Sequence, residues 1–224
     1  MSSINIAIDG PAGAGKSTIA KSASKALGFI YVDTGALYRA VGVNALRLGI
    51  TPSDAEAVES SLKDVNVELR FIDGQQRVFL NGEDVSEEIR TPAASMAASD
   101  VSAIPAVRAF LFDLQRDIAS KNNCLMDGRD IGTEVLPDAQ IKIFLTASVE
   151  ARAQRRYKEL TEKGMTVDYK DVLEEMAQRD YNDSHREIAP LKPAEDSVII
   201  DTTELDLQQS IDAVLSLIKK KLGK

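Results

Sequence analysis

The segment GPAGAGKS at residues 10–17 constrains this chain more than any other part of its sequence. A short apolar run precedes it and a pattern typical of a helix follows it, so a buried strand, a glycine-rich loop and a helix are predicted in direct succession. The segment fits the pattern G-x-x-x-x-G-K-[ST], whose fixed positions are occupied here by Gly10, Gly15, Lys16 and Ser17. We therefore expect the first strand of the fold to end in a loop that wraps around an anion.

The residues of this loop point to the phosphates of a nucleotide. Glycines let backbone N–H groups surround phosphate oxygens, and the N-terminus of the following helix adds a favourable dipole. Lys16 is expected to reach the β- and γ-phosphates, and the Ser17 hydroxyl to ligate Mg²⁺. The sequence therefore predicts a nucleotide-binding P-loop, which by itself does not say what happens to the nucleotide.

Short apolar runs alternate with longer helical patterns along most of the chain. The runs that predict strands are residues 4–9, 29–33, 124–127, 141–145 and 197–201. The patterns that predict helices are residues 16–27, 35–49, 54–62, 104–120, 149–163, 172–183 and 207–222. This alternation indicates an α/β fold with a parallel sheet covered on both faces by helices.

Residues 65–89 break this alternation. Their sequence, VNVELRFIDGQQRVFLNGEDVSEEI, repeats with a period of two and carries Asp73-Gly74 and Asn81-Gly82 as turn signals. We therefore expect a small antiparallel meander inserted in the α/β domain.

The composition limits the classes of partner. The formal net charge of −8 argues against general affinity for nucleic acid or an anionic membrane, so an anionic ligand must be held by a local concentration of Arg and Lys. Cys124 is the only cysteine, which rules out an internal disulfide. The sequence shows no secretion signal at its start and no apolar run of membrane-spanning length, so we expect a cytoplasmic protein.

A regulatory GTPase switch is the main alternative from another class of P-loop protein. Such switches read guanine with an N/T-K-x-D element and sense the γ-phosphate with D-x-x-G, and neither pattern occurs in this sequence. ATP-driven motors usually need longer chains. An enzyme that transfers the phosphate is therefore favoured.

Two predicted strands end in clusters of Arg and Asp. The second strand runs into DTGALYR, with Asp33 and Arg39, and the third runs into MDGRDIG, with Asp127, Arg129 and Asp130. The carboxyl edge of an open α/β sheet is where ligands bind. A carboxylate at the position of Asp127 can support Mg²⁺ through water, although each Asp alone is also a common turn cap.

Further arginines suggest what accepts the phosphoryl group. Arg152 and Arg156 are four residues apart on one helical face, an unfavourable pair of like charges unless an anion lies between them. Phosphoryl transfer needs such charges, and an acceptor phosphate is already largely ionised at neutral pH, so it needs no general base. The lone His185 has no evident role. Many arginines without an obvious base favour a nucleoside monophosphate acceptor.

Six segments of the chain together resemble the bacterial cytidylate (CMP) kinases. They are IDGPAGAGKST, DTGALYR, EDVSEEIRT, DGRDIGT, PDAQIKIFLTAS and RDYNDSHREIAPL, in that order. The resemblance runs from Ile6 to the last predicted strand. It is specific, because other nucleoside monophosphate kinases share the P-loop but not DGRDIGT or the inserted sheet.

The resemblance implies that ATP, with Mg²⁺, phosphorylates CMP or dCMP to CDP or dCDP. It implies a single P-loop kinase domain over residues 1–224, with a five-stranded parallel sheet flanked by helices. A small antiparallel insertion near residues 65–90 would bind the nucleoside monophosphate, and a helical lid would lie near residues 152–166. A broader UMP/CMP kinase is the alternative enzyme, and a monomer without nucleic-acid or membrane partners is expected.

The resemblance also assigns site residues. The ATP phosphates are expected on Gly10, Pro11, Ala12, Gly13, Ala14, Gly15, Lys16, Ser17 and Thr18, with Ser17 on the metal. The expected contacts of the acceptor are Arg39, Arg129 and Arg186 to its phosphate, Thr34, Ser99, Arg108 and Asp130 to cytosine, and Arg179 and Asp183 to the sugar. Gly128 is included among the substrate-binding residues, and the residues expected in catalysis are Lys16, Asp127, Arg129 and Arg156.

The chemistry of cytosine agrees with these assignments. Cytosine offers a donor at N4 and acceptors at N3 and O2, so Asp130 can accept from N4 while Arg108 donates to the acceptors. Uracil presents its O4 acceptor to the same carboxylate and should be repelled. Thr34 stands where many relatives have Ser, which keeps the hydroxyl but adds a methyl group near the base.

Overall fold

The computed structural model describes residues 3–72 and 75–223, which fall into two compact units. The first unit comprises Val32–Asn122, and the second comprises residues 3–31 and 123–223. The meander predicted at residues 65–90 is part of the first unit. The segment predicted as a lid, residues 152–166, is part of the second.

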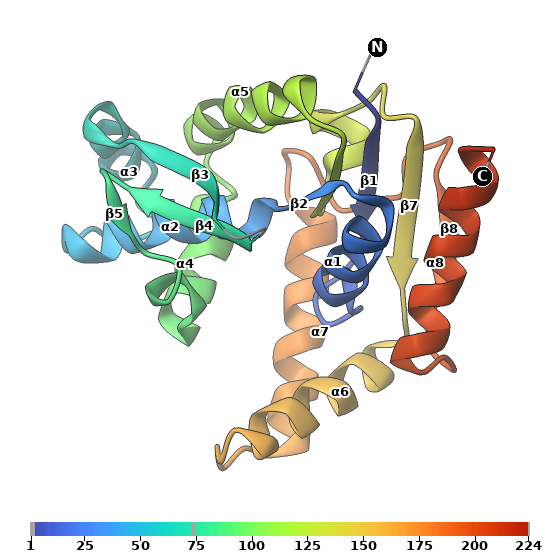
Figure 1. Cartoon of the computed structure of the whole chain (residues 1–224). Helices are drawn as coiled ribbons and strands as arrows, with labels where there is room; N and C mark the ends of the chain where they lie inside the picture. Colours follow the sequence, from blue (N-terminus) through green and yellow to red (C-terminus); the bar gives the residue numbers. More distant parts are fainter. Residues whose placement is uncertain (1–2, 73–74, 224) are drawn as a thin grey trace. The chain divides into compact units, whose positions relative to one another are not determined.

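A five-stranded parallel sheet, as the alternation of elements predicts, carries the phosphate loop (Figure 1). Its strands, in spatial order, are β2 (Ile30–Asp33), β6 (Cys124–Gly128), β1 (Asn5–Asp9), β7 (Ile141–Thr146) and β8 (Val198–Asp201). In the central strand, Ile8 lies opposite Asp127 of β6 on one side and Ile143 of β7 on the other. The carboxyl ends of β1 and β6 therefore lie next to each other.

Helices of the second unit cover this sheet and extend from it. They are α1 (Lys16–Leu27), α6 (Val149–Glu162), α7 (Tyr169–His185) and α8 (Leu207–Lys221), with one π-helical turn, η3 (Ile131–Val135), after β6. Ile19 of α1 and Val214 of α8 share a buried cluster with Ile8 and Ile143 of the sheet. The helices α6 and α7 pack on each other around Ala153 and Met176.

The described residues of the first unit form four helices and the predicted antiparallel meander. The helices are α2 (Thr34–Arg47), α3 (Ala55–Ser61), α4 (Pro92–Val101) and α5 (Pro105–Lys121). The meander strands are β3 (Val67–Ile72), β4 (Gln75–Leu80) and β5 (Glu83–Asp84), with short 3₁₀ turns at Leu62–Asp64 and Glu88–Arg90. The predicted turn Asn81-Gly82 joins β4 to β5 with positive φ at both residues. The other predicted turn, Asp73-Gly74, lies outside the described residues.

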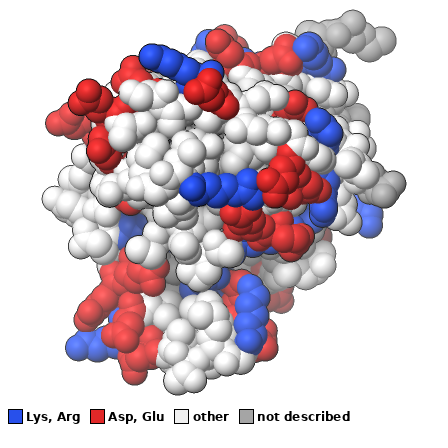
Figure 2. All heavy atoms as spheres, turned by 90° about the vertical axis from the view of Figure 1, so that its left-hand side faces the viewer, with Lys and Arg blue, Asp and Glu red and all other residues white. Residues whose placement is uncertain are grey.

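Surface ion pairs tie the meander to the end of α2. Arg47 donates to Glu83 at 2.8 Å and also pairs with Glu88, while Arg77 of β4 pairs with Asp84 at 2.8 Å. Figure 2 shows Lys and Arg interspersed with Asp and Glu over the face that it presents. Exposed pairs of this kind contribute little stability each, about 0–1 kcal/mol, so the first unit depends mainly on its core.

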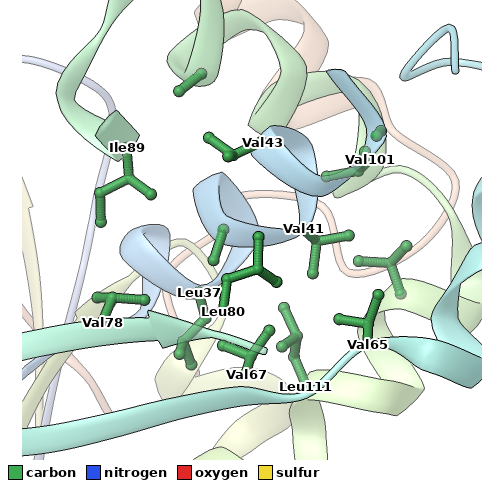
Figure 3. Close-up of a cluster of buried hydrophobic side chains, with 14 of the residues drawn as sticks. Leu37, Val41, Val43, Val65, Val67, Val78, Leu80, Ile89, Val101 and Leu111 are labelled. Carbon is green, nitrogen blue, oxygen red and sulfur yellow. The ribbon is translucent and has the colours of Figure 1, made fainter. Parts of the chain in front are cut away.

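The core of the first unit is aliphatic and lies between the meander and α2 (Figure 3). Leu37 and Val41 on one face of α2 meet Val67 and Leu80 from the meander. Leu111 of α5 joins the same cluster. The alternation that predicted the meander therefore places its apolar residues on one buried face.

One helix was missed by the sequence prediction, and another begins earlier than predicted. The helix α4 was not predicted, although its start carries two ordinary signals: Pro92 in the first turn and Thr91 as the cap that accepts from the Ala94 N–H. The helix α7 begins at Tyr169 rather than at residue 172, because Asp168 caps it. Among the described residues, no helix is both long and apolar enough to cross a membrane.

Truncation of Leu37 should test this core. We expect Leu37→Ala to lower the free energy of unfolding by about 2–5 kcal/mol, because Leu37 is fully buried and the cavity cannot collapse completely. Leu48→Ala, at the exposed end of the same helix, is the matched control and should change stability by less than about 0.5 kcal/mol. Urea unfolding followed by circular dichroism measures both. Equal effects would show that the core is placed wrongly.

Candidate active site

The phosphate loop is held by close packing of its backbone. Gly10 has a φ of 149°, and a Cβ atom there would lie 1.9 Å from the carbonyl oxygen of Leu145 in β7. Only glycine permits this contact. Gly15, with a φ of 84°, then turns the chain into α1 and offers no capping side chain. The first N–H groups of α1 are therefore left for an anion.

Lys16 is a buried cation at the start of α1. Its ammonium group donates to the Pro11 carbonyl at 2.7 Å within the loop. Burial, and then the charge of Arg129, lower the pKa of Lys16 well below its ordinary value, while Asp127 and two other carboxylates oppose this shift. An incoming phosphate would stabilise the charged form, so the site is built to receive negative charge.

Ser17 and Asp127 provide two oxygens that fit a magnesium ion. The Ser17 hydroxyl donates to Asp127 Oδ2 at 2.9 Å, and the Tyr31 hydroxyl donates to Asp127 Oδ1 at the same distance. Within residues 3–72 and 75–223 there is no group of three His, Cys, Asp or Glu side chains that could hold a metal. Mg²⁺ in kinases needs no such group, because substrate phosphates and water fill most of its coordination sphere. The hydroxyl–carboxylate pair fits that arrangement.

An Arg–Asp cluster lies where β6 ends and α7 ends. Arg129 Nε donates to Asp183 Oδ2 at 2.8 Å, and Arg186 Nη2 lies 3.5 Å from Asp130 Oδ1. Burial alone would raise the pKa of Asp183, but Arg129 above all, followed by Arg179 and Arg186, holds it below its ordinary value. The structure therefore brings together five residues that the sequence assigned to the acceptor.

Asp9, which sequence reasoning missed, lies beside this cluster. It is the last residue of β1, immediately before the phosphate loop, and it is almost completely buried. Its two carboxylate oxygens accept from the backbone N–H groups of Ile131 and Gly132, each at 2.7 Å. Burial raises its pKa to about 6. The available signal was a charged residue at the end of an apolar strand.

The predicted pair Arg152 and Arg156 is not a pair of free charges. Arg152 is buried and donates to the Ala12 carbonyl of the phosphate loop and to Asp180 Oδ1, each at 3.0 Å. Arg156 is 44% exposed and donates to Glu159 at 3.0 Å. Because carboxylates of the protein already balance both arginines, their spacing alone does not require an anion between them. The catalytic role of Arg156 stays a prediction.

In the first unit, Asp33 organises the start of α2. Its Oδ1 caps the helix by accepting from the Ala36 N–H at 3.0 Å, and its Oδ2 accepts from Arg39 at 2.8 Å. Gln76 of the meander accepts from the Asp33 N–H at 2.8 Å and donates to its carbonyl at 3.3 Å. The side chain of Arg39 is therefore fixed through a residue that the meander holds. Sequence reasoning did not find Gln76, because its partner is 43 residues away.

Three of the four residues assigned to the acceptor base belong to the first unit. Thr34 is buried as the first residue of α2, and Ser99 is half-buried on α4. Arg108 is buried on α5, with its guanidinium carbon 5.9 Å from the ring centre of Tyr38. The predicted acceptor residues are thus divided between the two units, with Asp130 and Gly128 in the second.

These features define a class of protein. A parallel sheet, a P-loop between β1 and α1, and a carboxylate on the neighbouring strand that accepts from the P-loop serine constitute a P-loop kinase fold. The structure of an uncharacterized protein from Eubacterium ventriosum shares this fold. It has a TM-score of 0.54 and 16% identity, and the likeness covers 96% of this chain and 98% of that one.

The sequence then shows the family. Residues 6–220 match the cytidylate kinase family. A cytidylate kinase of Caldicellulosiruptor saccharolyticus is 52% identical over 223 residues, which is 100% of this chain and 99% of the relative. A cytidylate kinase of Caldanaerobacter subterraneus is 53% identical over 217 residues, or 97% and 95% of the two chains. This chain belongs to the cytidylate kinase family, as its motifs predict.

Removal of the Lys16 charge should abolish most of the activity. We expect Lys16→Ala to lower kcat by about a hundred- to thousandfold, equivalent to roughly 2.7–4 kcal/mol, because Lys16 meets charge that develops during transfer. Lys21→Ala, on an exposed position of the same helix, is the control and should leave kcat unchanged. Thermal unfolding verifies that both variants fold. A folded Lys16→Ala variant with near-normal kcat would refute the P-loop assignment.

Proposed function

We propose that this chain transfers the γ-phosphoryl group of ATP to CMP or dCMP, giving ADP and CDP or dCDP. The observation that carries the proposal is membership of the cytidylate kinase family over nearly the whole chain. The site supports it, because the buried Lys16 and the Ser17–Asp127 pair suit a nucleoside triphosphate. The Arg–Asp cluster suits a second phosphate.

The donor side of the reaction belongs to the phosphate loop. The N–H groups of the loop and of α1 bind phosphate oxygens, while Lys16 exchanges the Pro11 carbonyl for the β- and γ-phosphates. Ser17 would hold Mg²⁺ directly, and Asp127 would hold it through water. The metal, when bound, neutralises charge on the phosphates. Asp127 keeps the Ser17 hydroxyl in place for this role.

The acceptor phosphate is assigned to Arg129 and Arg186, together with Arg39. Asp183 accepts from Arg129 through one oxygen, which orients the guanidinium before any ligand arrives. The family resemblance assigns the sugar hydroxyl to Asp183 as well, together with Arg179. The acceptor oxygen is already ionised, so these residues need only hold it in line with the γ-phosphorus. No residue needs to remove a proton.

Recognition of cytosine is assigned to Asp130, Arg108, Ser99 and Thr34. Asp130 is 5% exposed and therefore offers a carboxylate in surroundings where an unmatched partner is costly. Use of dCMP, low use of UMP, a monomeric state and a cytoplasmic location without nucleic-acid partners are expectations that rest on the sequence.

A coupled assay of ADP release tests the reaction. CMP and dCMP should support rapid turnover, and UMP, AMP, GMP, dTMP and shikimate should support little. Strong turnover with UMP would select the broader UMP/CMP kinase instead. Tight GTP binding without turnover that depends on an acceptor would overturn the proposal in favour of a GTPase switch.

The sharpest test of base recognition is Asp130→Asn. The amide can donate as well as accept, so it suits uracil O4 and removes the charge that repels it. Loss of a charge-assisted hydrogen bond should cost CMP about 1.5–3 kcal/mol. We therefore expect the ratio of kcat/KM for CMP over UMP to fall about tenfold or more.

A matched control separates this effect from loss of charge in the region. Asp138→Asn, at an exposed position, should leave the CMP/UMP ratio unchanged. Because Asp130 also faces Arg186, the variant can weaken the binding of both substrates as well. Equal losses for CMP and UMP would mean that Asp130 serves Arg186 alone, and cytosine selection would then lie with Arg108, Ser99 or Thr34.

A further inference from the structure

Asp9 connects two loops that carry different parts of the candidate site. Its backbone leads directly into Gly10 of the phosphate loop, and its carboxylate accepts from the N–H groups of Ile131 and Gly132 at 2.7 Å. These two N–H groups begin the turn η3, directly after Arg129 and Asp130. One residue therefore joins the start of the phosphate loop to the loop that carries the acceptor residues.

The contact is too close to be incidental. A Cβ atom on Gly132 would lie 3.3 Å from Asp9 Oδ2 and 3.2 Å from Lys142 Cδ, so a side chain there would crowd the contact. Both oxygens of Asp9 are used, and the residues they join are more than a hundred positions apart in sequence. These two hydrogen bonds therefore fix the loop at two consecutive residues.

We propose that the ionised side chain of Asp9 is a positioning residue for phosphoryl transfer, which holds Arg129 and Asp130 in register with the phosphate loop. It touches neither substrate in this role and acts through the backbone of the turn. The proposal rests on the phosphoryl transfer proposed above.

The charges around Asp9 argue against a purely stabilising role. Burial, the main cause, and the nearby Asp130 raise its pKa from 3.8 to about 6, while the two backbone N–H groups and Lys16 lower it. Lys142 of β7 faces the same contact through its aliphatic carbons, and its ammonium group pairs with Asp196. Because the folded pKa is above the unfolded one, the stabilising contribution of the protonated form is present below pH 3.8 and is lost as the pH rises through about 6. At neutral pH the ionised carboxylate therefore costs stability.

The pH dependence of positioning is opposite to that of stability, because the ionised form of Asp9, which costs stability, is the form that holds the loop. Above a pH of about 6, the ionised carboxylate accepts from both N–H groups. Below it, the protonated oxygen becomes a donor that faces an N–H donor, and one hydrogen bond is lost. The loop should therefore be held above a pH of about 6 and released as the pH falls below it.

Asp9→Asn provides the test, because an amide has the shape of a protonated carboxyl group. At a pH of about 8, we expect kcat and kcat/KM for CMP to fall by about tenfold to a hundredfold, since small displacements of positioned groups are costly. The KM for ATP should rise by less than kcat falls, because Lys16 and Ser17 keep their hydrogen-bond partners, although Lys16 loses the nearby charge of Asp9. The midpoint temperature of thermal unfolding at this pH should change little, although the activity falls.

The ratio of wild-type to variant activity should depend on pH. Dividing the two rates cancels the titration of the substrate phosphates, whose pKa also lies near 6. The ratio should fall toward one at a pH of about 5, where wild-type Asp9 is mostly protonated. A ratio that stays constant with pH would mean that Asp9 has only a structural role, and the proposal would be wrong.

A second variant covers the case in which Asp9→Asn fails to fold. Gly132→Ala leaves Asp9 intact but adds a Cβ atom 3.3 Å from its Oδ2, which crowds the contact, so kcat should fall and the KM for ATP should hold. The double variant Asp9→Asn/Gly132→Ala should lose little more kcat than the more impaired of the two single variants. Additive losses of kcat would overturn the proposal. The control Asp138→Asn should behave as wild type. Absence of CMP turnover in the wild-type chain would instead refute the proposed function.

Discussion

The candidate site depends on charges that the fold removes from water around the phosphate loop. Lys16 is buried at the start of α1, and the charges that act on it are those of Arg129 and of three carboxylates, Asp127, Asp9 and Asp183. Burial and Arg129 disfavour the ammonium charge. The negative charge of a phosphate favours it, so this arrangement suits an anion at the loop.

Carboxylates in this protein act mainly on other protein groups. Asp127 orients the Ser17 hydroxyl, Asp183 holds Arg129 and Asp180 holds Arg152. Each fixes a donor in a geometry that a flexible side chain would otherwise reach only at an entropic cost. Pre-arranged donors are what phosphoryl transfer requires, since the protein contributes positioning and charge rather than covalent chemistry.

Sequence reasoning succeeded where the signal is local. The phosphate loop, the parallel sheet, and the meander with its Asn81-Gly82 turn follow from short patterns, because glycine spacing and hydrophobic period act over a few residues. It did not find Asp9 or Gln76, whose partners lie 122 and 43 residues away. It also interpreted the spacing of Arg152 and Arg156 as unfavourable without an anion between them, because it could not place Asp180, which lies on another helix, next to Arg152. Family resemblance supplied the assignment of the acceptor residues, which stays a prediction, because no local pattern distinguishes them from surface arginines.

The net negative charge of the chain is compatible with anionic ligands, because many of its carboxylates near the site are paired with other protein groups. A net charge of −8 should repel nucleotides at long range, but salt screens exposed charges beyond about 10 Å. At short range, acids such as Asp183 accept hydrogen bonds from arginines and hold them in place. Asp9 extends the same principle to the backbone, because it positions two N–H groups instead of a guanidinium. The local field at the phosphate loop is therefore set by which groups the acids hold, and the total charge has little influence on it.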